Sequence, residues 1–411
     1  MNELQAVCEA YEAARARGER TALATVVQVE GSAYRRPGAR MLITERGHTA
    51  GSISGGCLER DVLEHAAQVM QTGAAQIIEY DTRGSEDIVW GLGLGCNGVV
   101  RILLESLHEG STGTRALQYI AACLHARKAG IMPTVIRKME TTKHENDTYH
   151  IGARFMFAEH GLNDYARSFA ADLDARIRAD AQTALREGRP MLRAYETSAL
   201  RIEIFFDVLM PPRALIIFGA EQDALPVVQQ ARLLGWHVTV VDTRARNATL
   251  ERFSAADEVV LCRAESVAAH IALPTDAAAV VMTHNYLDDV ALVATLLPSP
   301  LPYIGLLGPK QRTAKLLAEL RASNVLLTDA QLARLHSPIG MDIGAETPAE
   351  IALAISAEIK AVSATRGGGF LRERNAPIHD ERASQLVVRD FPLAPRAAVR
   401  ASASVMGCRA S

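Results

Sequence analysis

The residues best suited to chemistry lie in two glycine-rich segments of the N-terminal half. Cys57 follows a glycine pair in GSISGGCLE, and Cys96 lies within GLGLGCNG. The apolar spacing from Leu58 onward predicts a helix that begins just after Gly56. A helix N-terminus favours a thiolate and binds phosphate, because its free N–H groups point outward and its dipole is positive there.

A third segment, GSAYRRPGARM, adds Arg35, Arg36 and Arg40 as possible cationic donors. Thiolates suit soft metals and sulfur chemistry, and arginines bind phosphate, so the three segments indicate an anionic ligand with affinity for sulfur. The candidate contacts are Arg35, Arg36, Gly55, Gly56, Cys57, Gly93, Gly95 and Cys96. Loop arginines often face only solvent, and Cys96 could be a small residue in a tight turn, so these alternatives stay open. No four ligands at short spacing are found, so no structural zinc site is expected.

A dinucleotide fingerprint, G-x-G-x-x-G, occurs in full at 93–98, but a β-rich run follows where the fingerprint requires a helix. A degenerate copy begins at Gly219, after the apolar run 214–218 and before a helical segment. Glu221 replaces its second glycine and would repel a pyrophosphate. Asp242 stands about 20 residues downstream, where a ribose-binding acid belongs. These features predict a Rossmann-type fold with weak nucleotide binding, and the same fold without NAD is an equally open alternative.

The elements that must position these residues begin with an α+β N-terminal domain over 1–210. Its signature part, 1–110, has predicted helices at 2–17 and after Gly56 and predicted strands at 21–30, 39–44, 49–54, 76–80 and 99–105. The middle section, 111–210, has predicted helices near 114–128 and 164–187 and predicted strands near 133–138, 149–157, 191–196 and 200–209. We expect the middle section to complete the sheet of the signature part.

Regular alternation of strands and helices begins after Pro211-Pro212. The predicted strands are 213–218, 237–242, 257–262, 278–283 and 302–306, and a further helix covers 348–362. This order predicts a Rossmann-like, doubly wound parallel-sheet domain over 211–364, so the class is α/β. From 365 to 411 the periodicity is lost and eight arginines outnumber four acids, which predicts a disordered basic tail.

Composition excludes several classes of protein. The 411 residues carry a net charge of −3, which gives no reason to expect a nucleic-acid partner. The six cysteines are scattered, without a CxxC pair, which suits a reducing compartment. Residues 1–20 have the pattern of an amphipathic helix rather than a signal peptide, and no apolar run approaches the ~20 residues of a membrane span. We therefore expect a cytoplasmic protein.

Several long segments resemble the signature of one known family, XdhC/CoxI. In the N-terminal half these are GSAYRRPGARMLI, GSISGGCLERDV and GLGLGCNG. In the C-terminal half they are VVMTHNYLDDVAL, YIGLLGPKQRTAKLL and HSPIGMDIGAETPAEIALAISAEI. The segments occur in family order over roughly 20–110 and 210–362, which is far more specific than a single glycine pattern.

The resemblance implies a molybdenum-cofactor chaperone. Such a protein binds a pterin that carries a dithiolene and a phosphate, protects it, supports its sulfuration with a cysteine desulfurase, and delivers it to a xanthine-dehydrogenase-type molybdenum hydroxylase. By position, the resemblance implies cofactor contacts at Cys57 and Cys96. It also implies a polar contact at His284, with Asp288 or Asp289. We further expect a homodimer.

The sequence departs from the family pattern at Glu221, at Pro309-Lys310, where Ser-Arg is usual, and beyond residue 365. The runner-up function is an oxidoreductase that uses NAD(P) or another nucleotide in the Rossmann-like domain, and Glu221 argues against it. A thiol enzyme based on Cys57 is a third alternative. No nucleophile–base–orienter set is recognisable in the sequence, so an accessory factor is favoured over an enzyme.

Overall fold

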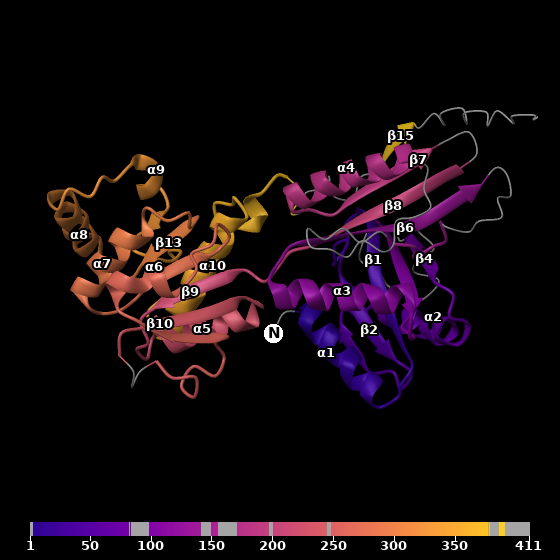
Figure 1. Ribbon diagram of the computed structural model, residues 1–411, viewed down its shortest axis with the longest axis horizontal. Coiled ribbons are helices and arrows are strands. Elements are labelled where there is room, and N and C mark those ends of the chain that lie inside the picture. The colour runs from indigo at the N-terminus through magenta and orange to yellow at the C-terminus, as the bar shows by residue number, and fades with distance from the viewer. Residues whose placement is uncertain are drawn as a thin grey trace, which may run out of the picture.

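The computed structural model describes residues 3–81, 83, 98–140, 149–154, 171–196, 200–244, 248–376, 378 and 386–390. These residues form two lobes that lie side by side (Figure 1). The first lobe contains two mainly antiparallel sheets, and the second contains one parallel sheet covered by helices on both faces.

A five-stranded antiparallel sheet forms the centre of the first lobe, in the order β3-β2-β1-β5-β4. Its strands are β1 (Thr21–Gly31), β2 (Arg40–Thr44), β3 (Thr49–Gly51), β4 (Gln76–Asp81) and β5 (Gly98–Ser106). Alternate side chains face opposite layers. Val26 and Ile43 pack against α2 (Glu59–Thr72), whereas Leu23 and Leu42 pack against α1 (Glu3–Ala16) and α3 (Thr112–Ala126). The strands and helices predicted for 1–110 are confirmed, except that the strand predicted at 49–54 ends at Gly51.

The middle section builds a second sheet instead of completing the first. Strands β6 (Gly130–Glu140), β7 (Met191–Glu196) and β8 (Leu200–Leu209) are joined by β15 (Leu386–Asp390) in the order β15-β7-β8-β6. Because β6 and β8 pair along their length, their backbone groups are used within this sheet. Helix α4 (Ala171–Glu187) covers one face, and Ile136, Leu192 and Phe205 on the other face pack on the first sheet. The prediction of a single sheet is therefore wrong.

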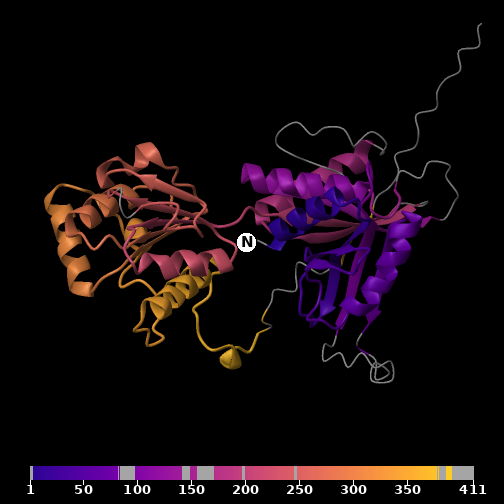
Figure 2. The same cartoon turned by 90° about the horizontal axis from the view of Figure 1, so that it is seen from below.

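Two smaller predictions also fail. The described part of the predicted strand 149–157 forms only an isolated bridge, between Arg154 and Thr134. The predicted disorder of the tail is wrong for 386–390, because this β-prone segment pairs in parallel with β7 through Leu386 to Asp390. Figure 2 shows the chain after α10 (Pro348–Ser363) turning back from the second lobe toward the first.

The second lobe contains the predicted doubly wound sheet. Its strand order is β11-β10-β9-β12-β13-β14, and every neighbouring pair is parallel. The strands are β9 (Ala214–Phe218), β10 (His237–Asp242), β11 (Glu258–Leu261), β12 (Ala278–Val281), β13 (Tyr303–Leu306) and β14 (Leu335–His336). The two-residue β14 was not predicted. The strand order reverses between β9 and β12, and ligands of such sheets bind at the carboxyl ends of the strands beside this switch point.

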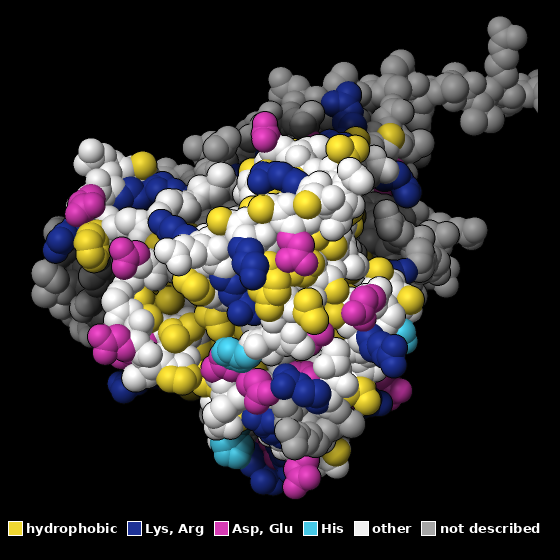
Figure 3. All heavy atoms as spheres, turned by 90° about the vertical axis from the view of Figure 1, so that its left-hand side faces the viewer, with side chains coloured by type: hydrophobic (Ala, Val, Ile, Leu, Met, Phe, Trp, Pro, Cys, Tyr) yellow, Lys and Arg dark blue, Asp and Glu magenta, His cyan; other side chains and the backbone are white. Residues whose placement is uncertain are grey.

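Helices cover both faces of the parallel sheet. They are α5 (Ala224–Leu233), α6 (Val267–His270), α7 (Tyr286–Leu296), α8 (Lys310–Ala322), α9 (Asp329–Leu332) and α10, with short 3-10 turns at Ala264–Ser266 and Leu371–Glu373. Helices α7 and α8 pack on one face, and α5 and α10 pack on the other. Hydrophobic, basic and acidic side chains are interspersed on the end face of this lobe (Figure 3). In the described part of the chain, no helix combines the length and apolar character needed to cross a membrane.

Candidate functional site

The segment around Cys57 is a compact loop, residues 52–58, which we call the cysteine loop. Helix α2 begins at Glu59 with Leu58 as its N-cap, so the predicted helix is present but starts two residues later than expected, and Cys57 lies just before it. The buried Ser54 organises the loop, because its Oγ accepts from the N–H groups of Gly56 and Leu58, both at 3.1 Å. Glu59 accepts the N–H of Ser54 at 2.9 Å and its hydroxyl. Burial opposes ionisation of Glu59, yet these hydrogen bonds outweigh it and lower its pKa.

The arginine loop, residues 32–39, lies against the cysteine loop. The Tyr34 ring is 70% exposed, and a Cβ added to Gly55 would lie 3.5 Å from its carbons, so the two loops are in direct contact. Arg35 donates to one oxygen of Glu3, at the start of α1, and the other oxygen accepts the N–H of Ser52 at 3.1 Å. One carboxylate therefore holds both loops. Glu3 was not predicted as a site residue, because it precedes the two loops by about 30 and 50 residues.

The surface of the arginine loop is a shallow depression of about 500 Å³, lined by Glu3, Leu4 and residues 34–40. Both Arg35 and Arg36 belong to its wall. Gly56, in the neighbouring loop, has φ +105° and open space where a Cβ would stand, so a ligand can reach its backbone. Cys57 is half-buried and packs on the α2 side of the first sheet.

The predicted residues Gly93, Gly95 and Cys96 lie outside the described residues. The chain re-enters the structure at Gly98, the first residue of β5. A Cβ at Gly98 would stand 2.3 Å from the carbonyl oxygen of Glu30 and 2.9 Å from that of Ser32. Only glycine allows this approach, which brings the start of β5 to the start of the arginine loop.

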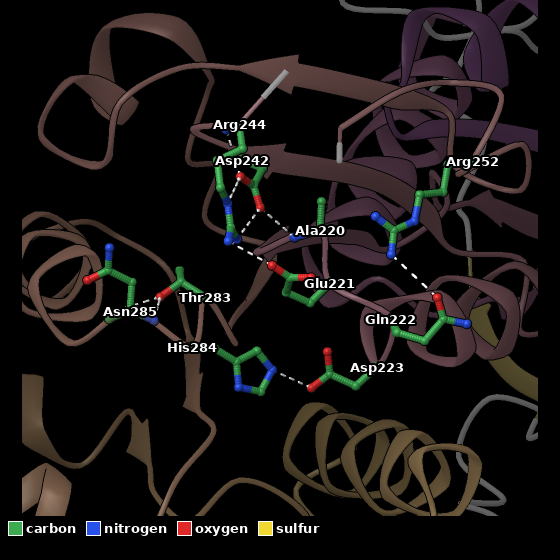
Figure 4. A network of polar contacts seen from close by, with 10 residues as sticks. All are labelled: Ala220, Glu221, Gln222, Asp223, Asp242, Arg244, Arg252, Thr283, His284 and Asn285. Atoms are coloured by element: carbon green, nitrogen blue, oxygen red, sulfur yellow. Dashed lines mark hydrogen bonds and ion pairs between the residues drawn. The ribbon is translucent and has the colours of Figure 1, made fainter. Parts of the chain in front are cut away.

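The second lobe carries the other predicted residues, Gly219, Asp242 and His284, after the carboxyl ends of β9, β10 and β12. Figure 4 shows Asp242 and His284 with their partners. Gly219 has φ +118°, and a Cβ there would stand 2.4 Å from the carbonyl oxygen of Met282, so glycine is required for contact with the neighbouring chain segment. The buried Asp242 accepts the N–H of Ala220 at 2.7 Å and that of Arg244 at 2.8 Å. Burial opposes its ionisation, but the hydrogen bonds from the Arg244 guanidinium and from these two N–H groups lower its pKa. The acid expected to bind ribose is thus already engaged with the protein.

Glu221 is paired rather than facing open space. Its carboxylate lies 2.7 Å from Arg244 Nη1, so the charge expected to repel a pyrophosphate is partly neutralised within the loop. The cavity beside Asp242 measures only about 20 Å³, roughly enough for one water molecule. Arg244, which was not predicted as a site residue, lines this small cavity and contacts both Asp242 and Glu221.

His284 lies at the switch point, on the segment after β12. It has φ +56°, and its Nε2 lies 2.7 Å from Asp223 Oδ2. Asp288 lines the small cavity, and burial together with the nearby Glu265 raises its pKa. Asp289 is different, because it is 1% exposed and accepts bonds from Thr283 and Arg312. It therefore has a structural role, and His284 and Asp288 remain the accessible pair of this segment.

The predicted residues thus form two clusters, one in each lobe. The cysteine and arginine loops lie in the first lobe, and Gly219, Asp242 and His284 lie in the second. Among the described residues, no group of three or more His, Cys, Asp or Glu side chains is arranged to hold a metal ion. Fold and site together define a class of two-lobed proteins, in which one lobe carries a glycine–cysteine loop and the other is a Rossmann-type domain.

Comparison with known proteins identifies the family. Residues 14–81 match the model of the XdhC and CoxI family, and residues 215–359 match that of the XdhC Rossmann domain. A Bacillus subtilis protein named as a probable xanthine dehydrogenase subunit is 32% identical over 343 residues, which is 83% of this chain and 92% of that protein. The chain belongs to the XdhC and CoxI family.

Further relatives agree with this assignment. The molybdenum cofactor insertion chaperone PaoD of Escherichia coli is 35% identical over 94 residues, 22% of this chain and 28% of that protein. A crystal structure described as a xanthine dehydrogenase from Bacillus halodurans has 27% identity and a TM-score of 0.68, and the match covers 92% of this chain and 100% of that one.

Proposed function

We propose that this protein binds the molybdenum cofactor, protects it, and delivers it to a xanthine-dehydrogenase-type molybdoenzyme. The observation that carries the proposal is the juxtaposition of the arginine and cysteine loops through Glu3. This contact supports the proposal, because it sets the segment that contains Arg35 and Arg36 next to the segment that contains Gly56 and Cys57. The names of two relatives, a molybdenum cofactor insertion chaperone and a probable xanthine dehydrogenase subunit, support it.

The residues fit the cofactor by their chemistry. Arg35 and Arg36 suit its phosphate, because guanidinium groups bind phosphate oxygens through directed pairs of hydrogen bonds. Gly56 suits close approach of a flat ring, because no side chain covers its backbone. Cys57 would suit the molybdenum at the dithiolene end of the cofactor, because a thiolate is a soft metal ligand. The full set of proposed contacts is Arg35, Arg36, Gly55, Gly56, Cys57, Gly93, Gly95, Cys96, Gly219, Asp242 and His284.

A second part of the proposal concerns the partners, oligomeric state, location and domain limits of the protein. We propose that the protein supports sulfuration of the cofactor together with a cysteine desulfurase, works as a homodimer, and acts in the cytoplasm. We also propose domain limits at 1–210 and 211–364, with 365–411 as a separate basic segment. Co-purification of the tagged protein with a desulfurase, and its mass in solution, test the first two statements.

Replacement of Cys57 tests the proposed site. Protein and variants are produced in molybdate-fed cells, and molybdenum and oxidised pterin are measured per chain. Cys57→Ser should lose most of the bound cofactor, because it keeps the size but removes the soft donor. Cys123→Ser is the matched control, since Cys123 is also a half-buried free thiol but packs against α1. Equal cofactor content in both variants would refute the assignment of Cys57.

A second function remains because the second lobe has the Rossmann strand order and an acid at the end of β10. It is an oxidoreductase that uses NAD(P) or another nucleotide. The pairing of Arg244 with Glu221 and the small cavity argue against it. Titration of the protein with NAD in a calorimeter decides: micromolar affinity favours the oxidoreductase, and weak or undetectable binding favours the accessory role.

A further inference from the structure

A buried ion pair joins the second sheet to the arginine loop. Arg40 begins β2 directly after that loop, and Asp207 lies on β8, which belongs to the second sheet. Their side chains are only 4% and 5% exposed, and Arg40 Nη2 donates to Asp207 Oδ2. Burial raises the pKa of Asp207, and the positive charges of Arg40 and Arg154 oppose that rise.

Arg40 extends this contact to the backbone of the loop. Its Nη1 donates to the carbonyl oxygen of Gly38 at 2.9 Å. Gly38 has φ +96°, and a Cβ there would lie 3.5 Å from Asp207 Oδ1, so the carboxylate stands beside the loop backbone. The N–H of Gly38 donates to the carbonyl oxygen of Val26 at 2.8 Å. The end of the arginine loop is therefore held between β1 and a carboxylate from another sheet.

Stability alone is a weak explanation for this pair. Desolvation of two charges costs most of what their attraction returns, and apolar replacements of buried ion pairs are often neutral or stabilising. Directed hydrogen bonds, however, select one conformation, and the arginine loop has no helix or strand of its own to do so. The guanidinium of Arg40 supplies two such bonds at once, one to the carboxylate and one to the loop.

We propose that Asp207 is a positioning residue for the arginine loop, and thereby for the phosphate contacts Arg35 and Arg36. Only the statement about the phosphate contacts rests on the proposed function; the positioning of the arginine loop does not. Asp207 is not part of the wall of the depression over the arginine loop and acts through Arg40. The second sheet is thus a support that sets the geometry of the cofactor surface on the first sheet.

The chain offers a matched control. Glu105 on β5 and Arg154 form another ion pair, with side chains 2% and 5% exposed. Glu105 also lies beside Gly152, and within the described part of the chain it forms no hydrogen bond or ion pair with the arginine loop. Asp207→Asn and Glu105→Gln each remove one buried carboxylate charge and keep its shape. Both variants should lose stability, but only the first should loosen the loop.

Hydrogen exchange of the full chain without cofactor measures the loosening. The amides of Arg36 and of 38–40 should exchange at least about tenfold faster in Asp207→Asn than in wild type, and within about twofold of wild type in Glu105→Gln, after correction for global stability; Pro37 has no amide hydrogen. In molybdate-fed cells, the bound pterin per chain should fall in Asp207→Asn and much less in Glu105→Gln. If Asp207→Asn fails to fold, the double variant Arg40→Gln with Asp207→Asn removes both charges and takes its place.

The outcomes separate the two claims. Unchanged exchange at 36–40 in Asp207→Asn or in the double variant, or equal acceleration in Glu105→Gln, overturns the positioning role. A wild-type protein that retains no pterin refutes the proposed function, while the exchange data still decide whether Asp207 positions the loop.

Discussion

The replacement Glu221→Gly tests why the second lobe should bind dinucleotides poorly. Glu221 stands where a dinucleotide fold brings its backbone to the pyrophosphate, and its carboxylate pairs with Arg244 at 2.7 Å. The two side chains are 36% and 40% exposed, so the pair contributes at most about 1 kcal/mol to stability. The variant should therefore fold normally, and Arg244 should stay held by Asp242, to which its Nε and Nη2 donate at 3.1 and 3.2 Å.

The gain in affinity follows from the same geometry. Removal of the carboxylate, which leaves only Nη1 of Arg244 without its former partner, should favour pyrophosphate by about 1–3 kcal/mol, a factor of roughly 5 to 150 in the NAD dissociation constant. Calorimetric titration of wild type and variant with NAD measures it. Gln222→Gly is the control, because it adds the same flexibility one residue away without removing a charge. Micromolar binding by wild type, no gain in Glu221→Gly, or an equal gain in Gln222→Gly would refute the reasoning.

Two further predictions concern the first lobe, and one concerns the second. Replacing both Arg35 and Arg36 with Gln should weaken cofactor binding more at low salt than at high salt, because screening already reduces the attraction at high salt; equal losses would indicate lost packing. Asp289→Asn should lower the free energy of unfolding by about 1–3 kcal/mol in urea titrations, because it weakens the charged hydrogen bonds to Arg312, whose side chain is 29% exposed and can be hydrated; an unchanged free energy of unfolding would contradict this. Glu59→Gln should lower stability most at neutral pH. The folded-state pKa of Glu59 is depressed, so its contribution is present above about pH 4.5 and is lost as pH falls below the folded pKa; a stability difference that grows toward acid pH would contradict the assignment.

Local patterns predicted the elements of this protein well. The β/α alternation after residue 211 specified a parallel sheet. Apolar strands separated by amphipathic helices have few other arrangements in which the apolar surfaces of the strands and of the helices are all buried. The same patterns could not say which strands share a sheet. Strands 130–140 and 200–209 pair across some 60 residues, and their apolar alternation would suit either sheet of the first lobe.

The sequence predicted the loops of the candidate site but not the residues that hold these loops in place. Glycine, cysteine and arginine mark the loops by their types, so Cys57 and Arg35 stood out. Glu3 and Asp207 did not, because an isolated acid in a helix or strand looks like ordinary surface until the fold places it beside an arginine. Arg244 was missed for a related reason: its partner Glu221 comes from a different strand end.

The cofactor content of the purified wild-type protein tests the central claim most directly. The full chain is produced in molybdate-fed cells, and the molybdenum and the oxidised pterin that elute with it are quantified in one sample. The account predicts that both co-elute with the protein in equal molar amounts, and that cells without molybdate give protein without molybdenum. Protein from molybdate-fed cells that carries neither molybdenum nor pterin would contradict it.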